Sequence, residues 1–167
     1  MFKEISFTDV KENVVDLLKN QWGLVTAGDE NALNTMTVSW GAVGELWAKD
    51  MVTIYIRPQR YTVKFLEEKD YFTLSFYPKE CKQILSFCGT KSGKDVDKIK
   101  ETDLTPVFDE NAPYFKQAKL VLVCKKTAKG EFKPEQIIDK TIIDTQYPAN
   151  DFHYIYYGAV EKVLVKE

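Results

Sequence analysis

Several short segments of this chain alternate their side chains with a period of two, which is the spacing of a β-strand. Between residues 34 and 40, Asn, Met, Val and Trp fall on one face and Thr, Thr and Ser on the other. Residues 71–77 repeat the pattern, and Pro78 ends it. Residues 51–56 are apolar on both faces, which predicts a central strand. Strands this short, separated by turns, favour antiparallel pairing and a barrel.

The remaining segments carry further strand and helix signals. Strands are expected at 24–27, 118–125 and 152–165, the last of them bent at Gly158. Helices are expected from a cap at Asp9 to Trp22, at 62–69 with Thr62 as the cap, at 80–87 and, as a short piece, at 95–101. Residues 129–151 read as irregular, with a helical turn after Pro134. Without an internal repeat or a linker, we expect one domain over residues 1–167, mainly β with a few covering helices.

Counts of charged and metal-binding residues exclude several classes of function. The 25 acidic and 23 basic residues give a net charge of −2, which does not attract nucleic acid or an anionic membrane. A single histidine cannot build a histidine-rich metal site, so no metal centre is expected. Three cysteines without a Cys-x-x-Cys pair favour a reducing compartment. No apolar run approaches 18 residues, and the N-terminus carries charge, so we expect a cytoplasmic protein.

The motifs of several common enzyme classes are missing from the chain. It has no Gly-x-Gly-x-x-Gly fingerprint, no Walker loop and no Gly-x-Ser-x-Gly elbow. A nucleophilic triad would depend on His153, the only imidazole, and no serine or cysteine lies in a recognisable nucleophile turn. A hydrolase or a P-loop enzyme is therefore not expected.

Two polar segments each have two interpretations. The hydroxyl face of residues 34–40 is either an exposed barrel face or a hydrogen-bonding wall for a ligand. Residues 57–62, Arg-Pro-Gln-Arg-Tyr-Thr, lie between a buried strand and a helix start, where two guanidinium groups suit a phosphate. The alternative is that the two arginines lie on the surface and pair with Glu67 or Glu68.

Two further features are ambiguous by themselves. Residues 90–98 form a polar loop with three lysines and one glycine, which in most proteins is simply solvated. His153 precedes the aromatic run Tyr154-Ile155-Tyr156-Tyr157. A lone histidine is either structural or exposed, or it is a proton donor or a ligand contact.

Five blocks of the chain, taken together and in order, resemble the flavin reductase-like family, and within it the flavoredoxin-type branch. The blocks are Asn-Thr-Met-Thr-Val-Ser-Trp-Gly (34–41), 57–62, Asp-Tyr-Phe-Thr-Leu-Ser-Phe (70–76), Ser-Gly-Lys-Asp-Val-Asp-Lys (92–98) and His153 to Gly158. The resemblance covers nearly the whole chain. It implies an FMN-binding split β-barrel, Greek-key-like and antiparallel, which is usually a homodimer with the flavin near the interface.

The resemblance also implies roles for particular residues. The segment that would line the isoalloxazine and ribityl chain contributes Asn34, Thr35, Met36, Thr37, Ser39 and Trp40. The phosphate would be held by the residues Arg57, Pro58, Arg60, Tyr61 and Thr62. The loop that closes over the cofactor would supply Ser92, Gly93 and Lys98, with a lysine near the edge of the reduced, anionic ring. His153 would lie close to the flavin or to incoming nicotinamide, as the catalytic candidate.

The function implied by the resemblance is that of an FMN-dependent oxidoreductase. Hydride would pass from NADH or NADPH to FMN, and electrons onward to a small-molecule or protein acceptor. One alternative is a flavoredoxin-like electron carrier that does not oxidise NAD(P)H, and another is a non-catalytic barrel for a different phosphorylated ligand or a partner protein. Two departures bear on the choice: Lys94 stands where this branch has arginine, and a clear Gly-Asp-His motif is missing.

Overall fold

The computed structural model describes all residues from 1 to 167, and its centre is one antiparallel sheet. Its strands, in chain order, are β1 (Phe2–Ile5), β2 (Gly23–Gly28), β3 (Leu33–Val38), β4 (Gly41–Leu46), β5 (Lys49–Ile56), β6 (Tyr71–Phe76), β9 (Leu120–Glu131) and β10 (Tyr154–Lys166). They are hydrogen-bonded in the order β3-β2-β6-β9-β10-β5-β4, and β1 pairs with the end of β10. The short strands β7 (Pro106–Val107) and β8 (Tyr114–Phe115) form a separate pair.

The sheet curls until its two edges come close together. β3 and β4 lie at opposite ends of the hydrogen-bonded path, yet only Ser39 and Trp40 separate them in the chain. The three Cα–Cα links from Val38 to Gly41 span about 11 Å at most. Because β3 and β4 are not hydrogen-bonded to each other, the curled sheet is a split barrel, as expected from the sequence.

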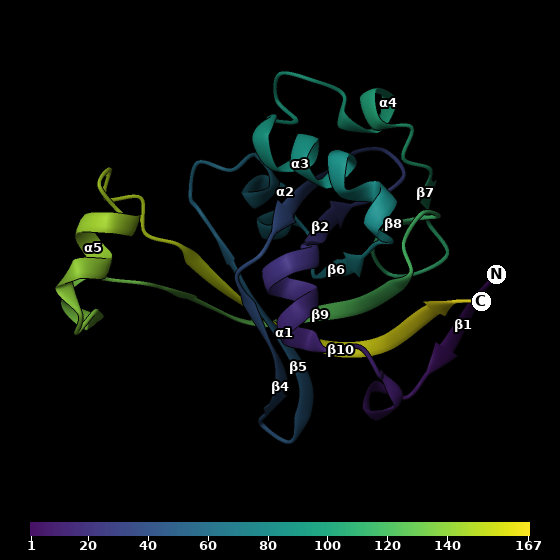
Figure 1. Cartoon of the computed structure of the whole chain (residues 1–167), viewed down its shortest axis with the longest axis horizontal. Helices are drawn as coiled ribbons and strands as arrows, with labels where there is room; N and C mark the ends of the chain where they lie inside the picture. The colour runs from purple at the N-terminus through teal and green to yellow at the C-terminus, as the bar shows by residue number, and fades with distance from the viewer.

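Helices cover one side of this barrel and one extends away from it (Figure 1). The helical segments are α1 (Val14–Asp16) with a π-helical continuation at Leu17–Gln21, α2 (Thr62–Glu68), α3 (Lys82–Thr90), α4 (Lys98–Thr102) and α5 (Lys140–Gln146). Short 3-10 turns lie at Phe7–Asp9, Lys79–Cys81 and Pro134–Gln136. In Figure 1, α3 lies over β2 and β6 with α4 beyond it, whereas α5 stands apart at the far ends of β9 and β10. We call residues 132–153, which carry α5, the arm.

Two apolar clusters stabilise the barrel, one on each face of its central strands. β9 contributes Leu120, Leu122 and Cys124 to one cluster, while Val121 and Val123 belong to the other, beneath α3. This alternation follows from the period of two along a strand. Each fully buried aliphatic side chain stabilises the fold by about 1.5–3 kcal/mol. All three cysteines are free thiols.

The predicted bend at Gly158 is confirmed by a shift in the pairing of β10 with β9 between Tyr157 and Gly158. A Cβ atom added at Gly158 would lie 2.6 Å from Phe72 and 2.9 Å from Cys124. The close approach of these two side chains therefore requires glycine at this position.

Several predicted boundaries were wrong for identifiable reasons. The first helix is capped by Asn13, whose side chain accepts from two backbone N–H groups, so the predicted cap at Asp9 is wrong. Tyr61, rather than Thr62, is the cap residue of α2. β1 and β4 were not predicted, and β5 lies next to the edge strand β4 instead of at the centre of the sheet. Within the segment expected to be irregular, β9 continues to Glu131, and the helical turn after Pro134 is confirmed.

None of the helices is both long and apolar enough to cross a membrane. The chain also has no group of three or more His, Cys, Asp or Glu side chains that could hold a metal ion.

Candidate functional site

Two adjacent clefts gather thirteen of the fifteen predicted site residues. The larger cleft, of about 300 Å³, is lined by Met36, Thr37, Ser39, Trp40, Arg57, Arg60 and His153. The smaller one, of about 90 Å³, is lined by Asn34, Arg60, Tyr61, Thr62, Ser92, Gly93 and Lys98. Arg60 lines both clefts, so together they form one elongated site.

The other two predicted residues have mainly structural positions. The Thr35 hydroxyl is buried, where it donates to the carbonyl of Val25 and bonds the Thr26 hydroxyl. Pro58 lies in the turn between β5 and α2, which is closed by a hydrogen bond from the Arg60 N–H to the Arg57 carbonyl. This turn directs Arg57 toward the larger cleft and Tyr61 and Thr62 toward the smaller one.

The smaller cleft is rich in hydrogen-bond donors and contains no carboxylate. Its lining includes the cationic residues Arg60, Lys91 and Lys98 and the hydroxyl residues Thr62 and Ser92. The Arg60 guanidinium donates to the carbonyl of Gly89 over 2.9 Å, and burial lowers its pKa. Such a set of donors suits a phosphate group, for which guanidinium and ammonium groups are the usual partners.

Lys98 is almost completely buried in the wall of the smaller cleft. Its Nζ donates to the carbonyls of Thr35 and Cys88, over 2.7 and 2.8 Å. Burial lowers its pKa to about 8, because an ammonium group is costly to remove from water. Lys98 thus ties β3 to the end of α3, and it lies on the smaller cleft, not on the larger one.

Asn34 and Gly93 bring the polar loop against β3. The Asn34 amide donates to the Thr62 hydroxyl over 2.7 Å, and Thr62 is the first residue of α2. A Cβ atom at Gly93 would lie only 1.9 Å from Asn34 Oδ1. The loop can therefore approach β3 this closely only because residue 93 is glycine.

The larger cleft combines aromatic, apolar and polar side chains. The Trp40 side chain is 46% exposed, and its ring centroid lies 5.2 Å from that of His153. Met36 is buried and Tyr55 half-buried along the same cleft. The Thr37 hydroxyl donates to the Leu85 carbonyl over 2.5 Å. Because α3 covers this side of β3, the interpretation of the hydroxyl face as exposed is wrong.

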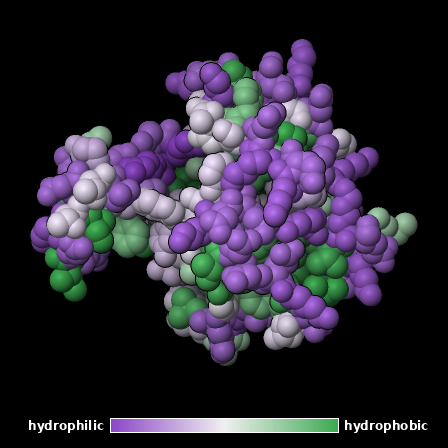
Figure 2. Space-filling view, viewed as in Figure 1, coloured by the Kyte–Doolittle hydropathy of each residue, from purple (hydrophilic) through white to green (hydrophobic).

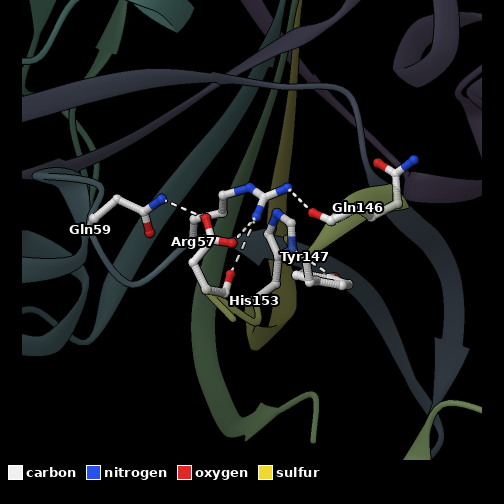
Figure 3. A network of polar contacts seen from close by, with 6 residues as sticks. Arg57, Gln59, Gln146, Tyr147 and His153 are labelled. Carbon is white, nitrogen blue, oxygen red and sulfur yellow. Dashed lines mark hydrogen bonds and ion pairs between the residues drawn. The ribbon is translucent and has the colours of Figure 1, made fainter. Parts of the chain in front are cut away.

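Arg57 links the barrel to the arm (Figure 3). Its guanidinium lies 2.7 Å from a carboxylate oxygen of Asp151 and donates to the carbonyl of Gln146 over 2.8 Å. Gln59 donates to the other Asp151 oxygen over 2.7 Å, and the pKa of Asp151 is lowered, first by Gln59 and also by Arg57. The alternative pairing of the arginines with Glu67 or Glu68 is wrong, because Glu67 contacts Lys129 and Tyr156, and Glu68 forms no ion pair.

His153 is only 7% exposed and directly precedes β10. Its Nδ1 is hydrogen-bonded to the Tyr147 hydroxyl over 2.8 Å. The pKa of His153 is lowered to about 4, first by burial and also by the neighbouring Arg57, while Asp151 opposes the shift. The imidazole is therefore neutral at pH 7.

Three further arm residues of this site were not predicted from the sequence. Gln146 lines the larger cleft, Tyr147 contacts His153, and Asp151 pairs with Arg57. All three lie in the segment interpreted as irregular. The one usable signal was the aromatic and charged side chains near the only histidine, which did not specify a partner.

A comparison with protein-family models matches residues 16–167 to the flavin reductase like domain. Among solved structures, flavoredoxin from Methanosarcina acetivorans is 20% identical, with a TM-score of 0.70 over 88% of this chain and 69% of that one. An FMN-binding domain of a flavin reductases-like enzyme from Shewanella baltica is 15% identical, with a TM-score of 0.71 over 99% and 77%. The styrene monooxygenase flavin reductase from Pseudomonas putida is also 15% identical, with a TM-score of 0.66 over 92% and 84%. The search of curated proteins gave no match.

Proposed function

Because this chain belongs to the flavin reductase like domain family, we propose that it binds FMN and transfers electrons through it. The observation that carries this proposal is the pair of clefts joined at Arg60. One cleft has the donors that a phosphate requires, and the other has the aromatic and polar surface that suits a ring system. Among the similar structures, the Shewanella domain is described as FMN-binding.

The chain's own residues fit the two ends of FMN. Arg60, Lys91 and the Thr62 hydroxyl would bind the phosphate in the smaller cleft, where no carboxylate opposes it. Trp40, Met36 and Tyr55 would pack against the isoalloxazine in the larger cleft. When bound, FMN supplies the hydride and electron chemistry, while these residues bind and orient it.

As the finer activity, we propose reduction of FMN by NADH or NADPH, with electrons passed onward to a small-molecule or protein acceptor. Trp40 leaves part of the cleft wall exposed, which would allow a nicotinamide to reach the ring. The neutral His153 would offer a hydrogen bond to the flavin ring without placing a charge beside the ring. The similar Pseudomonas protein is named as a flavin reductase.

The second candidate is a flavoredoxin-like carrier that holds FMN and receives electrons from a protein partner. The missing Gly-Asp-His motif favours it, and one similar structure is a flavoredoxin. Rapid mixing of the FMN-loaded protein with NADH and with NADPH separates the two. Bleaching of the flavin absorbance by either nucleotide supports the reductase, whereas no bleaching with both supports the carrier.

A homodimer with the flavin near the interface is part of the same proposal. The arm extends from the body, and apolar patches lie among its polar residues at the left of Figure 2. On it, Ile138 is 96% exposed and Ile142 is also exposed. Large exposed apolar side chains grouped on a projecting segment support contact with a second copy. Sedimentation of the wild type and of Ile138→Asp with Ile142→Asp tests this, and a monomeric wild type contradicts it.

The experiment that tests FMN binding is titration of the purified protein with FMN, followed by flavin fluorescence, together with mass spectrometry of any ligand released on denaturation. A saturable change with FMN supports the proposal. A protein that leaves FMN fluorescence unchanged and releases a different phosphorylated ligand would contradict it and favour a non-catalytic binding barrel.

A further inference from the structure

His153 and Tyr147 share a hydrogen bond. Its direction determines whether the imidazole presents a donor or an acceptor to the larger cleft. The Tyr147 hydroxyl lies 2.8 Å from Nδ1, on the buried side of the ring. Nε2 has no hydrogen-bond partner within the protein, and it is not among the buried unpaired atoms. Since His153 lines the larger cleft, Nε2 is the nitrogen that a bound ligand can reach.

The relative donor and acceptor strengths of the two groups decide which partner donates. A phenol is a stronger hydrogen-bond donor than a neutral imidazole N–H, and an imidazole nitrogen is a stronger acceptor than a phenol oxygen, so the favoured arrangement has the Tyr147 hydroxyl donating to Nδ1. Burial raises the pKa of Tyr147, with Arg57 acting to lower it and Asp151 to raise it. A guanidinium carbon 5.2 Å from the ring centroid also makes the phenol a better donor.

The position of Tyr147 is itself well defined. Its ring is buried and stacks on Phe152, with centroids 4.6 Å apart and planes inclined by 25°. The Arg57 contacts with Gln146 and Asp151 hold the chain on both sides of it. Figure 3 shows the imidazole of His153 between the guanidinium of Arg57 and the ring of Tyr147.

We infer that Tyr147 is a positioning residue that holds His153 in the tautomer with hydrogen on Nε2, so that the larger cleft is presented with a neutral N–H donor. The imidazole then hydrogen-bonds an acceptor atom of the bound ring and does not act as a base. A carbonyl oxygen or an unprotonated ring nitrogen is the ligand group that matches this donor. The tautomer is a property of the free protein; only the identity of the acceptor rests on the proposed function.

The single histidine makes the test direct, since ¹⁵N-labelled imidazole gives one set of signals. In the free wild-type protein at pH 7, we expect Nε2 to show the shift of a protonated nitrogen and Nδ1 that of a hydrogen-bonded acceptor. In Tyr147→Phe, which keeps the ring and its stacking, Nδ1 should lose the hydrogen-bonded shift and the other tautomer should become populated. Tyr71→Phe is the matched control, because Tyr71 lies on β6 and makes no contact with His153.

Hydrogen found on Nδ1 in the wild type would overturn the inference, as would identical Nδ1 signals in the wild type and Tyr147→Phe. Near-ultraviolet circular dichroism checks that the variant keeps its fold. Addition of FMN should then shift the Nε2 signal of the wild type. If FMN binds and Nε2 does not move, the donor role toward the ring is wrong. If FMN does not bind at all, the proposed function fails while the tautomer measured in the free protein still decides the role of Tyr147.

Discussion

Arg57 and Asp151 form an ion pair of 2.7 Å that joins the end of β5 to the end of the arm, across 94 residues of sequence. The contact follows from the pairing of β5 with β10, in which Ile56 lies opposite Tyr154. One step beyond that pair, Arg57 comes beside His153 and the residues that precede it. Arg57 therefore contacts the arm and also lines the larger cleft.

Arg60→Ala should weaken FMN binding about 10- to 100-fold and change riboflavin binding much less, because a charge-assisted hydrogen bond contributes about 1.5–3 kcal/mol. Riboflavin lacks the phosphate that Arg60 would bind. Fluorescence titration with both ligands measures the two losses. Lys94→Ala is the control, since Lys94 is an exposed cation of the loop that lines neither cleft. Equal losses for FMN and riboflavin would refute the phosphate assignment.

Arg57→Ala should weaken the binding of FMN and of riboflavin by similar factors, because Arg57 lines the larger cleft only. It should also release the arm, which Arg57 holds through Asp151 and Gln146. Hydrogen exchange at residues 140–152 should therefore be faster in this variant than in Arg60→Ala. A selective loss of FMN over riboflavin in Arg57→Ala would instead assign Arg57 to the phosphate.

Asp151→Asn should lower the melting temperature at neutral pH, with the difference disappearing in acid. The folded-state pKa of Asp151 is lowered below 3.8, so its contribution is present above the unfolded pKa and is lost as the pH falls through the folded value. The effect is modest because the pair is partly exposed to solvent. Thermal melts of both proteins between pH 3 and 7 measure the difference, and a constant difference over that range would contradict the prediction.

His153→Gln should flatten the pH dependence of stability between about pH 4 and 6.5. The folded pKa of about 4 lies below the ordinary value of 6.5, so in this window the unfolded chain binds the extra proton. The contribution of His153 therefore rises with pH through the window. Arg57 and Asp151 are the charged groups that face the imidazole. Denaturant unfolding at several pH values, compared between variant and wild type, checks this, and parallel curves would refute it.

Gly93→Ala should destabilise the protein by about 1–3 kcal/mol, which is the usual effect of overpacking, because the added methyl group overlaps Asn34. It should also weaken FMN binding. Gly44→Ala is the matched control, since a Cβ atom at Gly44 meets nothing within 4 Å. Thermal unfolding and FMN titration of both variants provide the comparison. Similar behaviour of the two variants would contradict the close contact between Gly93 and Asn34.

Several elements could be predicted from the sequence because each has its own periodic burial pattern. They include the strands at 71–77 and 118–125 and the helices after residues 61 and 81. β4 could not, since Gly41-Ala42-Val43-Gly44 has little strand preference and is extended because it pairs with β5. The Asp9 cap failed for a similar reason: a short local signal competes with a better one four residues later, at Asn13.

The predicted site residues fall in four of the five sequence blocks, but how they group in space could not be read from the sequence. Arg57, Arg60 and Thr62 form one block, yet the turn after β5 sends Arg57 to the larger cleft and Thr62 to the smaller one. The sequence did not specify the partners of Tyr147 and Asp151, because only the register of β5 on β10 brings them beside Arg57 and His153. Local periodicity determines which side of its own strand a residue faces. Which distant side chain it then meets depends on strand pairing across the sheet, and that was decided only by the tertiary structure.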